Sequence, residues 1–157
     1  MATPSTDTIL LDVFVTNQLR ERLIAAAVEG TDLPAEDYPF YVLVGAEGPL
    51  TPTGLAARTQ MPLSTVLFRL RRLEGRGHAD RIGNPNDGRS YLVRLTPAGS
   101  KLLGKARPRF RALAESVEQA IGPKSVQRLR ADLAALGEAI EGEISLAPSP
   151  PPSARRH

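Results

Sequence analysis

The sequence predicts a mainly α-helical fold with one small β-hairpin: a winged helix-turn-helix core flanked by helices at both ends. Two short helical segments meet at a tight connection in the middle of the chain, and a turn-rich hairpin follows them directly. Amphipathic helical patterns lie on both sides of this core. We expect residues 1–147 to form one domain, with the winged helix-turn-helix at about 36–96.

The first helix is predicted at about 8–29. Apolar residues recur there at every fourth position, and other apolar residues widen the stripe until Gly30 ends the helix. A second helix is expected within Ala35–Ala46, where Pro39 is tolerable only in the first turn. The first helix is apolar around most of its circumference, which one small domain could hardly cover.

Two helices then form the helix-turn-helix. Thr51 suits an N-cap and Pro52 the first helical position. After a short connection, the next helix runs from about Leu63 to Gly75. On its helical wheel three apolar residues face the core: Val66, Leu70 and Leu73. The opposite face carries Ser64, Phe68, Arg71 and Gly75, with Thr65 and Arg72 beside them.

The hairpin and the last helices complete the pattern. Strands at Ala79–Ile82 and Tyr91–Leu95 flank a segment dense in turn formers, so the hairpin reads as a wing. A helix is predicted from Thr96-Pro97 to Ile121, and the last helix has apolar residues at nearly heptad spacing. Together they span about 97–146, and the proline-rich basic tail at 148–157 should be disordered.

Composition excludes several classes of protein. The 157 residues are 41% hydrophobic and 24% charged, which is typical of a folded chain with a core. No apolar run is long enough to span a bilayer, and the first residues do not resemble a secretory signal, so we expect a cytoplasmic protein that does not bind membranes. With no cysteine and two histidines, we expect no disulfide, metal site or cofactor. Paired carboxylates, phosphate-binding glycine loops and nucleophile constellations are also lacking, so we do not expect an enzyme.

Charge is distributed unevenly along the chain. The net charge is +3, but residues 1–47 carry −6 and residues 48–95 carry eight arginines and three acids. An acidic start followed by a basic middle indicates a localised field for a polyanion. Charge alone leaves the alternative of solvated surface arginines open.

The basic residues fall on two elements that suit DNA. Arginines on an outward helix face can bind guanine in a major groove, and an arginine at a hairpin tip suits a narrow minor groove. We expect Asp87 to pair with an arginine and hold the tip in shape. An ordinary exposed helix remains an alternative, in which Phe68 packs on a neighbour. The candidate DNA-contact residues are Thr53, Ser64, Thr65, Phe68, Arg71, Arg72, Arg81, Asp87 and Arg89.

Several motifs resemble those of the MarR family of bacterial regulators. They are Leu50-Thr51-Pro52-Thr53-Gly54-Leu55-Ala56, Ser64-Thr65-Val66, Arg72-Leu73-Glu74, Asp87-Gly88-Arg89-Ser90 and Leu95-Thr96-Pro97-Ala98-Gly99. The resemblance implies a bacterial homodimer, with dimerisation helices at 8–29 and 97–146, that binds a pseudopalindromic double-stranded operator on the nucleoid. It also implies that Arg89 enters the minor groove with Asp87 as its support. Phe68 and Arg71 depart from the family pattern, where an arginine and an acid are usual.

The predicted function is a dimeric, sequence-specific regulator of transcription, a repressor that a small aromatic effector relieves. The residues expected nearest an effector cleft are Phe14, Arg20, Tyr38 and Tyr41, although core packing explains the aromatic ones at least as well. His78 is expected to be half-buried and neutral; sensing of pH and contact with phosphate are the alternatives. The alternative is a winged-helix module that binds proteins, or DNA without operator recognition.

Overall fold

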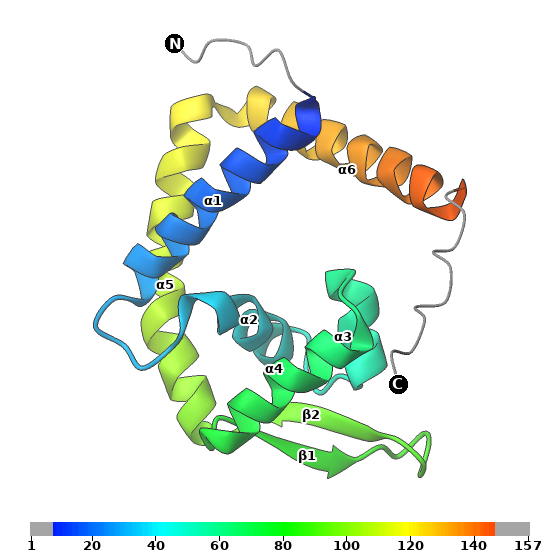
Figure 1. Cartoon of the computed structure of the whole chain (residues 1–157). Coiled ribbons are helices and arrows are strands. Elements are labelled where there is room, and N and C mark those ends of the chain that lie inside the picture. Colours follow the sequence, from blue (N-terminus) through cyan, green and yellow to red (C-terminus); the bar gives the residue numbers. More distant parts are fainter. Residues whose placement is uncertain (1–7, 147–157) are drawn as a thin grey trace, which may run out of the picture. The chain divides into compact units, whose positions relative to one another are not determined.

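The structure is a computed structural model that describes residues 8–146, and it has the expected fold class (Figure 1). Its elements, in chain order, are α1 (Ile9–Val28), the 3₁₀ turn η1 (Ala35–Asp37), α2 (Tyr38–Ala46), α3 (Pro52–Thr59), α4 (Leu63–Gly75), β1 (Ala79–Gly83), β2 (Tyr91–Leu95), α5 (Pro97–Ile121) and α6 (Pro123–Leu146). The predicted helices and strands are therefore confirmed. The tail predicted to be disordered, 148–157, lies outside the described residues.

The chain divides into two compact units, the first ending at Leu113 and the second beginning at Ala114. The first contains the winged helix-turn-helix, α1 and most of α5, and the second contains the end of α5 and α6. Whether the chain folds as the single predicted domain stays a prediction. Across residues 8–146, no helix combines the length and apolar character needed to cross a membrane.

Local signals in the sequence fix the start of α3. The main-chain N–H of Gly54 donates to Oγ1 of Thr51 at 3.0 Å, and Pro52 occupies the first turn, where it removes no helical hydrogen bond. The helix ends at Gln60, whose φ of 55° is left-handed. This tight end sets α4 directly after α3, as the helix-turn-helix prediction requires.

The core of the first unit lies beneath α4. Val66, Leu70 and Leu73 are each at most 1% exposed, as their 3.6-residue periodicity predicts. Their buried neighbours come from α1, α2, α3, β2 and α5, and include Ile24, Phe40, Tyr41, Leu55, Val93, Leu103 and Ala106. The same core therefore fixes which face of α4 points away from the domain.

The wing is an antiparallel pair with register from Ala79↔Leu95 to Gly83↔Tyr91. Leu50 adds a one-residue bridge, because its N–H and C=O both pair with Val93 at 3.2 and 2.8 Å. The sequence did not reveal this bridge, since a single residue has no periodicity. At the base of the wing, a Cβ on Gly99 would lie 2.1 Å from the carbonyl oxygen of His78, so only glycine allows this close approach.

Candidate nucleic-acid interface

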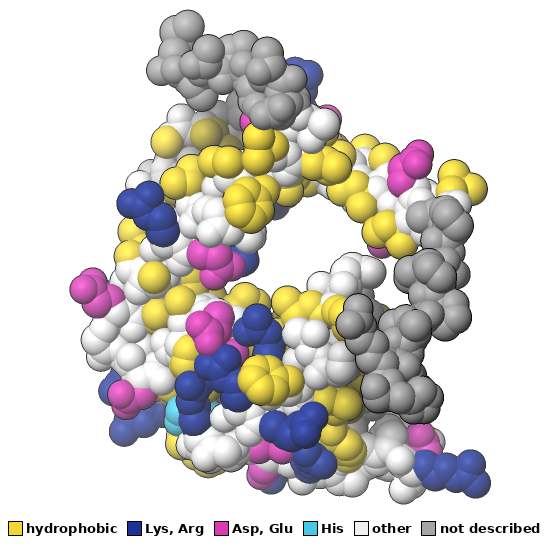
Figure 2. Space-filling view, viewed as in Figure 1, with side chains coloured by type: hydrophobic (Ala, Val, Ile, Leu, Met, Phe, Trp, Pro, Cys, Tyr) yellow, Lys and Arg dark blue, Asp and Glu magenta, His cyan; other side chains and the backbone are white. Residues whose placement is uncertain are grey.

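The face of α4 opposite its buried residues, here called its outward face, is exposed to solvent. Ser64, Phe68, Arg71 and Gly75 are all exposed, at spacings of four, three and four residues. Phe68 is 59% exposed. Hydrophobic and basic side chains lie side by side over this helix in Figure 2. The helical-wheel prediction is thus confirmed for these four residues, and most of Phe68 is open to solvent.

The structure divides the eight arginines of residues 48–95 into two groups. Six form ion pairs with carboxylates: Arg58 with Glu47, Arg69 with Asp37, Arg72 with Glu36 and Asp37, Arg76 with Asp37, Arg81 with Glu74, and Arg94 with Asp80. Within this stretch, all of which the structure describes, Arg71 and Arg89 have no carboxylate partner. Arg71 lies on the outward face of α4 and Arg89 in the turn at the wing tip, and both are exposed.

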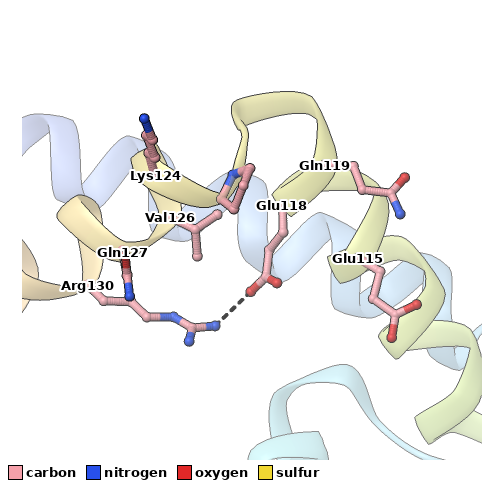
Figure 3. A pocket seen from close by; sticks show the side chains of 8 residues that line it. Glu115, Glu118, Gln119, Lys124, Val126, Gln127 and Arg130 are labelled. Carbon is pink, nitrogen blue, oxygen red and sulfur yellow. Dashed lines mark hydrogen bonds and ion pairs between the residues drawn. The ribbon is translucent and has the colours of Figure 1, made fainter.

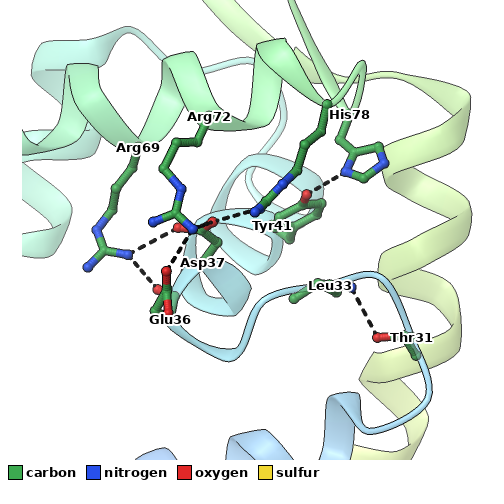
Figure 4. Close-up of polar contacts among 9 residues, drawn as sticks. Thr31, Leu33, Glu36, Asp37, Tyr41, Arg69, Arg72 and His78 are labelled. Atoms are coloured by element: carbon green, nitrogen blue, oxygen red, sulfur yellow. Dashed lines mark hydrogen bonds and ion pairs between the residues drawn. The ribbon is translucent and has the colours of Figure 1, made fainter.

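A buried carboxylate holds one side of α4. Asp37 is 0% exposed, and its two oxygens accept hydrogen bonds from Arg69 and Arg76, each at 3.1 Å. Arg72 approaches the same carboxylate at 3.4 Å, and Arg69 also donates to the carbonyl oxygen of Glu36 at 2.7 Å. In Figure 4 these groups converge between α4 and η1. We call Asp37, Arg69, Arg72 and Arg76 the Asp37 cluster.

The Asp37 cluster changes the interpretation of Arg72. The sequence placed Arg72 among the DNA-contact residues, but its guanidinium binds Glu36 at 2.7 Å and lies on the side of the helix that faces η1. The hydrogen bond with Glu36 raises the pKa of Arg72. The cluster was missed because Asp37 and Arg69 are 32 residues apart. One local signal existed, the three arginines at spacings of three and four on one side of the helix.

Arg81 is also neutralised within the protein. Its Nε donates to Glu74 at 2.6 Å, which raises the pKa of Arg81, and its guanidinium lies 4.5 Å from the ring centroid of Tyr91. Of the predicted DNA-contact arginines, Arg72 and Arg81 are thus held by carboxylates, whereas Arg71 and Arg89 are not.

The wing tip differs in one respect from its prediction. Asp87 does not pair with an arginine side chain; its Oδ1 accepts the main-chain N–H of Arg89 at 3.0 Å. Such a turn shapes the backbone and leaves the guanidinium of Arg89 unengaged. Asn84 adds a hydrogen bond from its Nδ2 to Oγ of Ser90 at 2.7 Å. A basic side chain projects from the tip of the hairpin in Figure 2.

Three candidate DNA-contact residues carry hydroxyl groups and lie in the first turns of α3 and α4. Thr53 is exposed, and its Oγ1 lies 3.1 Å from Oγ1 of Thr51. Ser64 is exposed and Thr65 half-buried in the first turn of α4. A helix N-terminus with hydroxyl groups favours phosphate oxygens.

Comparisons with known proteins agree with this geometry. No protein-family model matches the chain. The multiple antibiotic resistance protein MarR of Salmonella typhimurium is 29% identical over 97 residues, which are 62% of this chain and 67% of the relative. MarR of Escherichia coli is 27% identical over 123 residues, 78% of each protein.

Solved structures share the fold. A probable transcriptional regulator from Pseudomonas aeruginosa has a TM-score of 0.68 and 28% identity, over 83% of this chain and 97% of the other. A MarR variant from Escherichia coli, solved with operator DNA, has a TM-score of 0.71 and 23% identity over 79% and 89% of the two chains. PcaV from Streptomyces coelicolor, solved with its natural ligand, has a TM-score of 0.71 and 20% identity over 89% and 99%.

This chain is a MarR-like winged-helix protein. The resemblance noted in the sequence is confirmed. These relatives are regulators and not enzymes, in agreement with the expectation from the sequence.

The four residues expected to line an effector cleft have different surroundings: two are buried in the core of the first unit and two lie on α1. Tyr38 is 3% exposed and packs on Phe110 at 5.1 Å between ring centroids, and burial raises its pKa. Tyr41 is fully buried and shares a hydrogen bond of 2.7 Å with Nδ1 of His78. Burial raises the pKa of Tyr41 too, so its hydroxyl stays protonated. Both tyrosines are core residues, and His78 is half-buried as predicted.

The other two candidates lie on the exposed part of α1. Phe14 is 58% exposed, and Arg20 pairs with Glu21 and Asn17. In the second unit, an open pocket of about 630 Å³ lies in the bend between α5 and α6 (Figure 3). It is lined by Glu118 and Arg130, which pair at 2.9 Å, together with Val126 and other residues of the same bend, and by none of the four candidates.

Proposed function

We propose that this protein is a dimeric, sequence-specific regulator of transcription that binds a pseudopalindromic DNA operator in the bacterial cytoplasm. In this proposal α4 enters the major groove and the wing enters the adjacent minor groove. One observation carries it: of eight arginines in the winged core, the two without a carboxylate partner lie on the outward face of α4 and at the wing tip.

The physical reason lies in competition between anions. A guanidinium already bound to a carboxylate is largely neutralised, so it attracts a phosphate or a guanine edge less strongly unless it exchanges that partner. Arg71 and Arg89 need no such exchange. Arginine binds guanine O6 and N7 together in the major groove, and a narrow minor groove concentrates negative potential around an inserted arginine. The two unpaired arginines are therefore on the two elements that each groove can admit.

The test compares unpaired with paired arginines. A duplex selected from a randomised library is titrated at one salt concentration with the wild type, Arg71→Ala, Arg89→Ala and Arg94→Ala. Each variant removes one positive charge, but Arg94 is held by Asp80 at 2.8 Å. The first two variants should each lose about 1–3 kcal/mol of binding free energy. Equal losses for all three would indicate a nonspecific charge effect and contradict the proposal.

We also propose a homodimer, because apolar helix faces remain exposed. On α1 the exposed large hydrophobic residues are Ile9, Leu10, Leu11, Val13, Phe14, Val15 and Leu19. On α6 they are Leu129, Leu133, Ile144 and Leu146. Exposed apolar surface on this scale marks an association site. A dimer would also set two α4 helices about 34 Å apart, one turn of DNA. Light scattering should give twice the mass of the chain, and a monomeric wild type would contradict this part of the proposal.

Repression and its relief by a small aromatic effector complete the proposal. Support comes from PcaV, solved with its natural ligand, and from Bordetella bronchiseptica BpsR, whose DNA binding is regulated by 6-hydroxynicotinic acid. Phe14, Arg20, Tyr38 and Tyr41 remain the proposed ligand residues, although the buried tyrosines would have to move to touch a ligand. Small aromatic acids, 6-hydroxynicotinic acid among them, should displace the selected duplex. Unchanged affinity across such a panel would remove ligand control from the proposal.

A second candidate function follows from Phe68. An aromatic ring 59% exposed on the outward face of α4 also suits a protein partner. In that case the chain would bind its own upstream DNA and a scrambled duplex with equal affinity. Preference for the upstream DNA supports the regulator and excludes this alternative.

A further inference from the structure

We infer that Phe68 is a specificity-determining residue that reads the C5-methyl group of thymine in the major groove. The inference rests on the proposed function, in which α4 lies in that groove. It adds something that the proposal leaves open, the identity of a base in the operator.

Phe68 is unusual within the stretch between α1 and Leu113. From Gly30 to Leu113, all described, the only large hydrophobic side chains classed as exposed are Leu63 at 41% and Phe68 at 59%, and both belong to α4. Elsewhere in this stretch the large apolar side chains are buried or half-buried. Between Gly30 and Leu113, the fold thus covers its large apolar residues everywhere except on the helix proposed to meet DNA.

The neighbours of Phe68 point to a nucleic acid rather than to an apolar protein surface. Ser64 lies four residues before it and Arg71 three residues after it, both exposed on the same face. Arg71 has no carboxylate partner among the described residues, and its Nε donates only to the carbonyl oxygen of Leu67 at 3.2 Å. An unpaired guanidinium beside the ring requires an anionic or acceptor-rich partner, which an apolar surface does not offer.

The chemistry of the groove then selects the base. Thymine is the one DNA base that presents a methyl group, its C5-methyl, on the major-groove edge; the other bases are distinguished there by their donors and acceptors. A phenyl ring pressed against a donor or acceptor would strip it of water without replacing the hydrogen bond. Thymine is therefore favoured opposite Phe68. Arg71 is about 4.5 Å further along the helix axis, so a guanine is expected within one or two base steps of that thymine.

Replacing thymine by deoxyuridine removes this methyl group and nothing else. In a duplex selected from a randomised library, each thymine of one half-site is replaced in turn, and affinity is measured by fluorescence anisotropy. For the wild type, one replacement should weaken binding about fourfold, the effect of one buried methyl group. For Phe68→Ala the selected and substituted duplexes should bind equally, whereas Arg71→Ala should keep the fourfold difference.

Phe68→Leu provides a folded, apolar control. Since the ring is exposed, both Phe68 variants should keep the wild-type unfolding midpoint. The leucine variant should retain part of the methyl dependence. Selective binding that is insensitive to every deoxyuridine, or that keeps its methyl dependence in Phe68→Ala, would overturn this inference and leave the proposed function standing. Failure to select any duplex over a scrambled one would overturn both.

Discussion

Two sides of α4 use the same residue type for different purposes. On one side, Arg69, Arg72 and Arg76 converge on the fully buried Asp37. On the other, Arg71 faces outward beside Phe68 without a carboxylate partner in the described chain. Arg71 and Arg72 are adjacent in sequence, yet the helix turns them about 100° apart. An arginine-rich helix is therefore not a uniformly basic surface. Carboxylates from distant parts of the sequence pair with some of its arginines, and only the unpaired arginines remain available to bind a partner.

The two sides also differ in what they contribute to the fold. The Asp37 cluster takes charges out of water, which is unfavourable unless hydrogen bonds and opposite charges compensate. Here the guanidinium groups of Arg69 and Arg76 supply both, and they tie α4 to η1. The outward face makes no comparable contact. We therefore expect the cluster to determine stability and the outward face to determine DNA binding.

The largest expected effect is that of Asp37→Ala. The variant leaves three guanidinium groups close together without their shared carboxylate, and it should lose about 3–5 kcal/mol of unfolding free energy. Urea denaturation measures this loss. Asp32→Ala, which removes an exposed acid five residues earlier, is the matched control and should change stability by less than about 0.5 kcal/mol. Similar losses for the two variants would show that the cluster has no special role.

A pair of arginine variants separates the two sides directly. Arg76→Ala removes one hydrogen bond from the buried carboxylate and should lower the unfolding free energy by about 1–3 kcal/mol. Arg71→Ala should leave stability within about 0.5 kcal/mol while weakening binding to the selected duplex. Each variant removes one positive charge, Arg71→Ala from α4 and Arg76→Ala from the residue that caps its C-terminus. If Arg71→Ala destabilised the fold as much as Arg76→Ala did, the outward face of α4 would contribute to stability as much as the Asp37 cluster does.

The sequence predicts the two sides of α4 unequally well. Helical periodicity is local, so it correctly predicts Val66, Leu70 and Leu73 in the core and Ser64, Phe68 and Arg71 on the outward face. Ion pairs depend on which distant segments the fold brings together. The partner of Arg72 was therefore missed.

The wing also contains contacts that the sequence pattern does not predict. Turn-forming residues predicted the hairpin, but they did not reveal that Asp87 would bind the main chain of Arg89 and not a side chain. The main-chain bridge between Leu50 and Val93, which are 43 residues apart, could not be predicted either. Backbone pairing of a single residue produces no periodic pattern of side chains.

The smallest expected effect concerns the exposed ion pairs. Hydrogen bonds from Arg58 and Arg94 lower the pKa values of Glu47 and Asp80. A carboxylate whose pKa is lower in the folded state stabilises the fold above its unfolded pKa, and this contribution is lost as the pH falls through the folded pKa. Between about pH 6 and about pH 2.5, the wild type should therefore lose slightly more stability than the Glu47→Gln, Asp80→Asn double variant, as measured by thermal unfolding.

This difference in stability should shrink at high salt, because exposed ion pairs are screened. A double variant with the same or a steeper loss on acidification would show that these surface pairs, unlike the Asp37 cluster, do not contribute to the fold.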